Sequence, residues 1–263
     1  MTATLPLRIR GRVVPEALIE PLPEVLAPEG WRAHLGREGA LMLRGALDAD
    51  AVQAAREAVL DRLVAVGEVE PPAGVGLMTG TSRRRELQPD LGTFWQDVSE
   101  RPALRAVSHA GALAAVMETL SGGPLQPDGF LWLRVKGQGA GSPLRSGLSL
   151  AGKAAEGGLL AWIPLGAIEF HQGPVYVVQD SHLNAVPAGA APDLRPDASR
   201  LLTARFEPGD LLVLLPRTLY GAFDNDSRHR LVRASCESLW RKAGAPAVEA
   251  AYAEIPSAQP LDG

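Results

Sequence analysis

The sequence predicts a mostly β fold with helices packed on the outside, and two patterns carry this prediction. Up to about residue 125, apolar residues recur at helical spacing. After residue 129, short apolar or alternating runs are separated by clusters of Gly, Pro, Asp and Asn, which is typical of strands joined by turns. Six or more short strands after a helical half indicate an antiparallel sandwich or barrel. Because 46% of the 263 residues are hydrophobic, one sizeable core is possible, and we expect a single domain over residues 1–263.

The first segment, residues 1–29, is rich in proline among apolar residues. Proline lacks the backbone N–H that a helix interior needs. We therefore expect an extended arm that lies over the domain and has no fold of its own.

Residues 30–125 are expected to form a mainly helical buttress for the sheets. A helix from Trp31 precedes a short strand over residues 41–43 and a second helix, for which Asp48 is a good N-cap. A further helix is predicted over residues 103–120, because its apolar residues form one stripe that ends at a pair of glycines.

Residues 126–245 are expected to form the β core. The predicted strands are the runs "FLWLRV", "GGLLAWIPLG", "GPVYVVQ", "LLTARF", "GDLLVLLP" and "VRASCESLW". The segment "NAVPAGAAPDLRPDAS" lies between two of them and is predicted to be a long surface loop.

Charge and composition exclude several classes of protein. The net charge of -4 comes from 26 basic and 30 acidic residues mixed along the chain, which does not fit a surface that binds nucleic acid. No stretch approaches the roughly 18 uninterrupted apolar residues of a membrane span, and we expect no membrane partner. The single cysteine, Cys236, makes no internal disulfide and is interpreted as a small buried hydrophobe. These features predict a cytoplasmic protein.

Four motifs follow one another in the strand-rich half. They are "LLAWIPLG" at Leu159–Gly166, "GPVYVVQDSH" at Gly173–His182, "FEPGDLLVL" at Phe206–Leu214 and "NDSRHRLVRASCESLW" at residues 225–240. In this order, and together with the earlier "GREGALMLRGALDADAVQAAREAVLDRL", they resemble the phytanoyl-CoA dioxygenase family, whose members use Fe(II) and 2-oxoglutarate. The resemblance implies a double-stranded β-helix, a jelly-roll of cupin type, with helices packed on one sheet.

The resemblance places the iron ligands of the family on residues that do not bind iron. The family's triplet of His, any residue and Asp aligns with Arg145, Ser146 and Gly147, and its distal His aligns with Tyr220. The loop "AGSPLRSGLSLAGK" contains no His, Asp or Glu, so a shift of a few residues does not recover the ligands. A site of this class needs two imidazoles and one carboxylate. We therefore predict no metal at this position.

The histidines offer one alternative metal site. His171 and His182 flank one predicted strand and could form a replacement site with Asp180. A histidine near the end of a strand more often satisfies local hydrogen bonds. His182 occupies the serine-histidine position of the family and is interpreted as a pocket-lining, substrate-binding residue.

In relatives, an arginine on the last strand holds the distal carboxylate of 2-oxoglutarate. A planar guanidinium suits this role because it can bind a carboxylate through two hydrogen bonds. The arginine often stands two residues before a serine. Arg233 and Ser235 match this pattern, and Arg230 is the competing choice. A structural role, as a loop-pairing arginine, remains open for both. Trp162 of the first motif completes the predicted substrate-binding set.

Arg145 and Tyr220 are the predicted catalytic residues, since the alignment points both into the cavity where relatives hold iron. A cation there can hold an anionic or carbonyl group, and a phenol can donate a hydrogen bond or exchange a proton. Lys136, Glu169 and Asp224 are on neighbouring motifs and are interpreted as surface charges.

Three functional hypotheses follow. The favoured one is a metal-independent enzyme without a cofactor, which acts on a small polar organic molecule in biosynthesis by cyclisation, isomerisation, dehydration or a similar step. The second is a non-catalytic homologue that binds a ligand or supports an active partner, as a homodimer or as a heterodimer with an active homologue. The third is an Fe(II)/2-oxoglutarate-dependent oxygenase with an atypical metal site.

Overall fold

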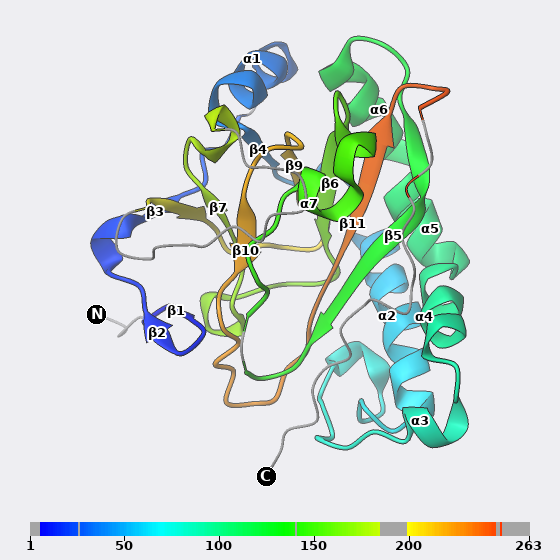
Figure 1. The fold of residues 1–263 in the computed structure, drawn as a ribbon. Helices are drawn as coiled ribbons and strands as arrows, with labels where there is room; N and C mark the ends of the chain where they lie inside the picture. The colour runs from blue at the N-terminus through cyan, green and yellow to red at the C-terminus, as the bar shows by residue number, and fades with distance from the viewer. Residues whose placement is uncertain (1–5, 26, 140, 185–198, 246–247, 249–263) are drawn as a thin grey trace.

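A computed structural model describes residues 6–25, 27–139, 141–184, 199–245 and 248. It shows two facing β-sheets with a layer of helices on the outer side of one of them (Figure 1). The loop predicted before residue 200 falls almost entirely outside the described residues. No helix in the described part of the chain is long and apolar enough to cross a membrane.

The larger sheet has five antiparallel strands. In spatial order they are β4 (Ala40–Leu43), β9 (Leu211–Leu214), β6 (Leu159–Pro164), β11 (Arg233–Arg241) and β5 (Gln126–Lys136). The edge strand β4 comes from the segment predicted to be a helical buttress. That segment therefore also contributes to the β core.

The smaller sheet has four strands. In spatial order they are β10 (Tyr220–Ala222), β7 (Val175–Val178), β8 (Leu201–Thr203) and β3 (Ile19–Pro21), with β3 parallel to β8. The strand β3 and the hairpin of β1 (Arg8–Ile9) and β2 (Arg12–Val13) belong to the predicted N-terminal arm, which is extended and joins this sheet. The prediction of a mostly β, double-stranded β-helix with helices on one sheet is confirmed.

The helices agree with the sequence prediction except between residues 84 and 121 and at residues 147–151, where no helix was predicted. The α-helices are α1 (Pro28–Glu38), α2 (Ala49–Ala65), α3 (Arg84–Leu87), α4 (Leu91–Ser99), α5 (Pro102–His109), α6 (Gly111–Ser121) and α7 (Gly147–Ala151). The predicted N-cap is present, since the Asp48 carboxylate accepts a hydrogen bond from Ala51 N at 2.8 Å. The single helix predicted over residues 103–120 is wrong. Its backbone is extended at Ala110 (φ -149°, ψ -168°), which divides it into α5 and α6.

Short 3-10 helices connect several of these elements. They are η1 (Glu16–Leu18), η2 (Ala73–Val75), η3 (Gly152–Ala155), η4 (Phe170–Gln172) and η5 (Ser181–Leu183). Helices α3 and α4 and strand β10 were not predicted from the sequence.

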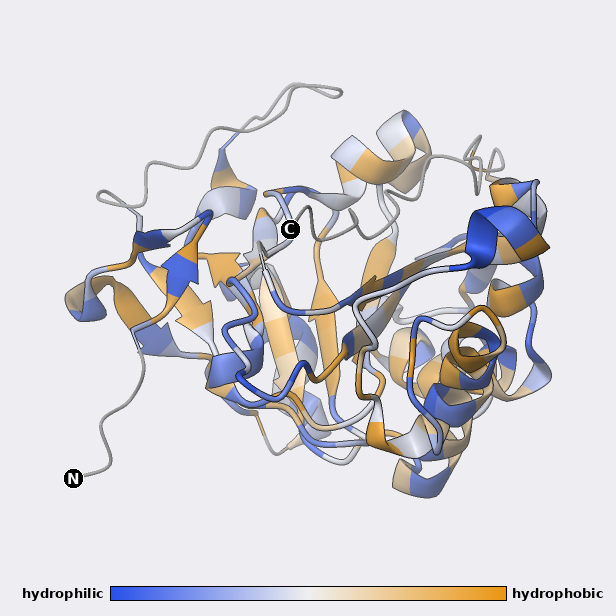
Figure 2. Cartoon of the chain, turned by 90° about the horizontal axis from the view of Figure 1, so that it is seen from below, coloured by the Kyte–Doolittle hydropathy of each residue, from blue (hydrophilic) through white to orange (hydrophobic). Residues whose placement is uncertain are grey.

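Strand alternation divides the larger sheet between two cores. In β11, Ala234, Cys236 and Trp240 pack in the apolar core that the sheet shares with α2, α4, α5 and α6, whereas Leu239 packs between the two sheets. Figure 2 shows these layers from below, with the helices beside the apolar strands. Cys236 is fully buried, as predicted, and burial raises the pKa of its thiol.

The Asp224 carboxylate joins three segments that are distant in sequence. It accepts hydrogen bonds from Arg10 N at 2.9 Å, Gly11 N at 2.7 Å and Gly141 N at 2.8 Å. The β1–β2 hairpin and the loop after β5 are thereby fastened to the segment that follows β10. Asp224 is buried, so its interpretation as a surface charge is wrong.

We predict that Asp224→Asn lowers the free energy of unfolding by about 1 to 3 kcal/mol. The neutral amide oxygen accepts two weaker hydrogen bonds than the carboxylate does, and the amide NH2 group then faces a backbone N–H, which is also a donor. Urea denaturation measures this loss, and hydrogen exchange should increase at the amides of Arg10, Gly11 and Gly141. Asp226→Asn is the control, since this half-exposed residue only faces Arg8 at 3.8 Å. Equal destabilisation by the two variants would contradict the assignment.

Candidate functional site

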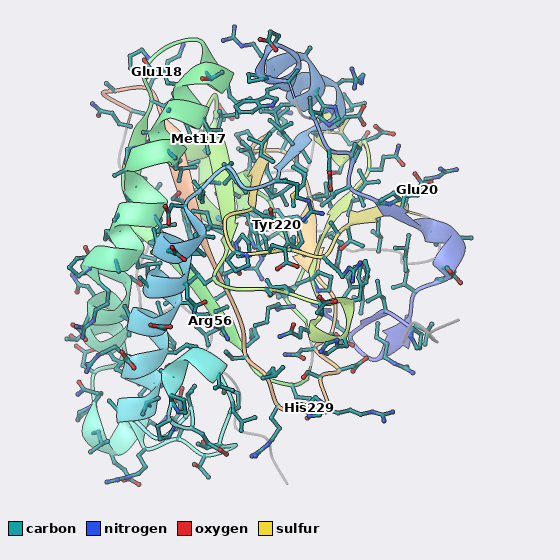
Figure 3. The ribbon with its side chains drawn as sticks, turned by 180° about the vertical axis from the view of Figure 1, so that it is seen from behind. Glu20, Arg56, Met117, Glu118, Tyr220 and His229 are labelled. Atoms are coloured by element: carbon teal, nitrogen blue, oxygen red, sulfur yellow. The ribbon has the colours of Figure 1, made fainter. Side chains whose placement is uncertain are left out.

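Arg145 and Tyr220 are direct neighbours through their backbones. Arg145 N donates to Tyr220 O at 2.8 Å, and Tyr220 N donates to Arg145 O at 2.9 Å. Two residues further on, Gly147 packs so closely against Pro216 that a Cβ atom on it would lie 3.0 Å from Pro216 Cα. The structure therefore brings together the positions that the family resemblance assigned to the iron ligands. Figure 3 shows Tyr220 in the middle of the molecule, between the two sheets.

A small polar cavity lies at this point between the sheets. Its lining includes the predicted residues Arg145, Trp162, Tyr220, Arg233 and Ser235. The cavity volume is only about 10 Å³, close to the smallest volume that holds one water molecule. The side chains thus nearly fill the space in which the sequence predicted a bound molecule.

Glu237 is the carboxylate at the centre of this cluster. Arg134 Nη2 donates to Glu237 Oε2 at 3.4 Å, and Arg145 Nη1 lies 4.0 Å from Glu237 Oε1. All three side chains are largely shielded from solvent, with exposed fractions of 12% for Arg134, 10% for Arg145 and 2% for Glu237. A single buried carboxylate therefore faces two guanidinium groups.

Two further cations add to the positive charge of the interior. Burial, followed by the charge of Arg233, lowers the pKa of Lys136. Burial, followed by the charge of Arg145, lowers the pKa of Arg233 to about 10. Burial and the neighbouring Arg134 likewise lower the pKa of Arg145. These shifts all have the sign expected where cations gather without enough anions. Lys136, interpreted from the sequence as a surface charge, is half-buried.

Two hydrogen-bond donors in this interior are incompletely satisfied. Among the described residues, Arg134 Nε is buried without a hydrogen-bond partner, and the buried Tyr220 Oη faces Glu237 but lies outside good hydrogen-bond geometry. Burial, and next the charge of Glu237, raises the pKa of Tyr220 well above its usual value of 10. The phenol therefore keeps its proton near neutral pH and acts as a donor. Of the two roles expected for this phenol, the raised pKa favours hydrogen-bond donation over exchange of the proton.

Arg233 is held by the backbone. Its guanidinium donates to Gly173 O and to Phe223 O, the latter at 3.0 Å, and lies 3.4 Å from Ser142 Oγ. Gly173 has φ +69°, and a Cβ atom there would lie 2.3 Å from Phe223 O, so only glycine allows this approach. Arg233 thus fastens the smaller sheet to the larger one, which is the structural role left open for it.

Two other predicted residues lie outside the cavity. Arg230 is half exposed and donates to Thr79 O and to Glu70 Oε1, each at 3.3 Å, which makes it the loop-pairing arginine that was its alternative reading. His182 is buried in η5 and lines a different pocket. The substrate-binding set drawn from the sequence is therefore divided among three places.

Arg134 and Glu237 were missed by the sequence analysis. Their signal is strand alternation, since Arg233, Ser235 and Glu237 are two residues apart on β11 and share one face with Leu239. The register of β11 and β5 then brings Glu237 opposite Trp132, two pairs from Arg134 and Ser235 and therefore on the same face. Only the pairing between the two strands identifies these partners.

The residues of this site do not fit ferrous iron. A guanidinium carries positive charge and has no lone pair to offer a cation, and the buried phenol keeps its proton. No group of three or more His, Cys, Asp or Glu side chains that could hold a metal ion occurs among the described residues. This finding also contradicts the replacement site of His171, Asp180 and His182, all three of which are described.

The fold is similar to those of several solved structures. The α-ketoglutarate-dependent carbocyclase SnoK from nogalamycin biosynthesis has a TM-score of 0.60 and 20% identity, with 93% of this chain and 97% of that chain covered. The α-ketoglutarate-dependent epimerase SnoN from the same biosynthesis has a TM-score of 0.59 and 21% identity, with 82% and 81% covered. EctD from S. alaskensis has a TM-score of 0.61 and 15% identity, with 97% and 89% covered. These likenesses show the fold.

The sequence itself identifies the family. No curated protein sequence matches the chain significantly. The family profile described as phytanoyl-CoA dioxygenase (PhyH) matches residues 35–234, which include the larger part of both sheets and all the residues of the inter-sheet cavity except Ser235 and Glu237. This chain therefore belongs to the phytanoyl-CoA dioxygenase family.

Proposed function

We propose that this chain is a metal-independent enzyme that acts on a small organic molecule carrying a carboxylate or carbonyl group, in a biosynthetic tailoring step such as cyclisation, isomerisation or dehydration. The observation that carries the proposal is an interior with surplus positive charge, in which Arg134 Nε has no partner among the described residues and Tyr220 Oη faces only Glu237, outside good hydrogen-bond geometry. A carboxylate brings both the acceptors and the negative charge that this interior lacks.

In this proposal Arg145 is the anion partner. Its contact with Glu237 is long, at 4.0 Å, and its Nε is 3.3 Å from Pro143 O. Such contacts are weaker than a two-point hydrogen bond to a carboxylate. Because the cavity volume is only about 10 Å³, side chains of the lining move apart when the acid enters beside Arg145.

Tyr220 supplies the chemistry in this proposal. Its raised pKa keeps the proton on Oη, so the phenol donates a hydrogen bond to an oxygen on which negative charge develops. The solved structures that share this fold include an epimerase and a carbocyclase, both described as α-ketoglutarate dependent. They support a tailoring role, while the guanidinium at Arg145 supports a reaction without iron.

We predict that the purified protein, incubated anaerobically with Fe(II) and 2-oxoglutarate and then desalted, retains no stoichiometric iron. Elemental analysis measures the metal, and succinate formation in air measures turnover of 2-oxoglutarate. The matched variant replaces Arg145→His, Gly147→Asp and Tyr220→His, which supplies two imidazoles and a carboxylate, and it should retain iron. Circular dichroism confirms that this variant folds, because a Cβ atom at residue 147 lies close to Pro216. One iron per parent chain, with oxygen-dependent succinate formation, would instead establish the atypical oxygenase.

We predict that at least one of acetate, succinate and 2-oxoglutarate stabilises the protein, and that Arg145→Ala weakens its binding by about 1 to 3 kcal/mol, because a buried charge-assisted hydrogen bond is lost. Thermal shift and titration calorimetry measure this. Arg230→Ala removes an exposed guanidinium and should leave the affinity unchanged. Equal losses in the two variants would refute the role of Arg145.

We predict that Tyr220→Phe weakens binding of the same acid by about 0.5 to 1.5 kcal/mol, the usual contribution of one hydrogen bond, without lowering the free energy of unfolding. The second expectation follows because Tyr220 Oη lies outside good hydrogen-bond geometry to Glu237 in the free protein. Urea denaturation and calorimetry on the same samples separate the two effects. Destabilisation with unchanged affinity would make Tyr220 a packing residue only.

The cavity volume of about 10 Å³ favours a second function. A homologue with a filled interior, which supports an active partner, needs no room for a substrate. If none of the three acids raises the melting temperature, this non-catalytic reading takes the place of the enzyme.

A further inference from the structure

A second pocket of about 250 Å³ lies outside the inter-sheet cavity. It is lined by Leu148 of α7, by Leu215 and Pro216 after β9, by His182 of η5, and by the exposed Glu156 and Arg217. The two cavities have no lining residue in common. Its volume is slightly below the roughly 300 to 1,000 Å³ of typical small-molecule pockets, so it suits a molecule about the size of one substituted ring.

His182 is the unusual residue in this pocket. It is buried, with 8% of its surface exposed, and neither Nδ1 nor Nε2 has a hydrogen-bond partner among the described residues. Buried polar groups nearly always have a partner, so an unpaired imidazole requires an explanation. A neutral imidazole offers one donor and one acceptor, and a hydroxyl group can complement either of them.

The surroundings of His182 hold its ring in place. A Cβ atom on Gly39 would lie 2.4 Å from His182 Nδ1, and Thr218 Oγ1 turns away from the ring because it donates to Gly39 O at 2.6 Å. Gly39 ends α1 with φ +74°, a backbone conformation that favours glycine. A side chain at this position would also collide with the His182 ring. The protein thus packs His182 tightly on one side without giving its nitrogens a partner there.

The rest of the lining indicates the kind of ligand. Leu148, Leu215 and Pro216 offer an apolar surface, and Pro216 O accepts from Leu148 N at 3.0 Å, which joins the two sides of the pocket. Glu156 and Arg217 carry opposite charges, so the pocket has no net charge to attract an ion. An apolar body with one hydrogen-bonding group fits these walls better than a carboxylate does.

We propose that this pocket binds a small neutral organic molecule with an apolar ring and a hydroxyl group, and that His182 binds the hydroxyl. The torsion χ2 of histidine has a broad energy profile, so a small rotation of the ring turns a nitrogen toward the pocket. This site is independent of the acid proposed for the interior, because it uses different residues and a ligand of different charge.

The test uses para-fluorophenol as the probe and fluorobenzene, which lacks the hydroxyl, as its matched control, both followed by fluorine NMR titration. We expect saturable binding of para-fluorophenol that is about tenfold tighter than that of fluorobenzene, equivalent to about 1.4 kcal/mol. His182→Phe keeps the ring and removes both nitrogens. It should abolish the preference for the phenol without lowering the melting temperature, since no hydrogen bond is lost.

Two further variants locate the site. Leu148→Trp fills the pocket and should abolish binding of both probes. His171→Phe changes a histidine in η4, outside this pocket, and should change nothing. The proposal is overturned if the parent protein shows no saturable binding of para-fluorophenol, or if His182→Phe retains the preference for it. A lower melting temperature of His182→Phe with unchanged binding also overturns it, because the imidazole then has only a structural role.

Discussion

The buried Glu237 carboxylate is the charge on which the interior of this protein depends. It faces Arg134 at 3.4 Å and Arg145 at 4.0 Å, in a space from which nearly all solvent is excluded. Opposite charges at about 4 Å attract by about 4 kcal/mol at an effective dielectric constant of about 20. This attraction offsets the cost of removing the charges from water, which otherwise disfavours buried ions. Without Glu237, the polar end of the inter-sheet space would hold only repelling cations beside Tyr220.

The backbone holds the same region together independently of these charges. Arg145 and Tyr220 are joined by two backbone hydrogen bonds, and Arg233 donates to carbonyl groups of the opposite sheet. The double-stranded β-helix therefore holds close together the positions that the family resemblance aligns with the iron ligands. The side chains in this region form a charged cluster with incompletely satisfied donors. This combination supports the anionic ligand that we propose for the interior.

Much of the fold followed from local patterns in the sequence. Periodicity predicted α1 and α2, alternation predicted most strands of both sheets, and Asp48 was recognised as an N-cap. Such patterns depend on neighbours within a few residues, so they can be read from one chain. The order of the motifs identified the family, and the alignment placed Arg145 beside Tyr220. The break between α5 and α6 was missed because the apolar stripe continues through it, while the backbone does not.

The sequence by itself determined the architecture and brought Arg145 and Tyr220 to one place, but only the tertiary structure decided which residues surround them and what they do. Arg134 and Glu237 are 103 residues apart and meet through the register of β5 and β11. Alternation assigns a side chain to one face of a strand, but it does not reveal the opposing charge. The same limit applies to Arg233, whose carbonyl partners come from the other sheet, and to His182, whose pocket is built from distant segments. Whether a side chain is buried, charged or without a hydrogen-bond partner depends on its neighbours in three dimensions. The pattern of residues along the chain does not specify those neighbours.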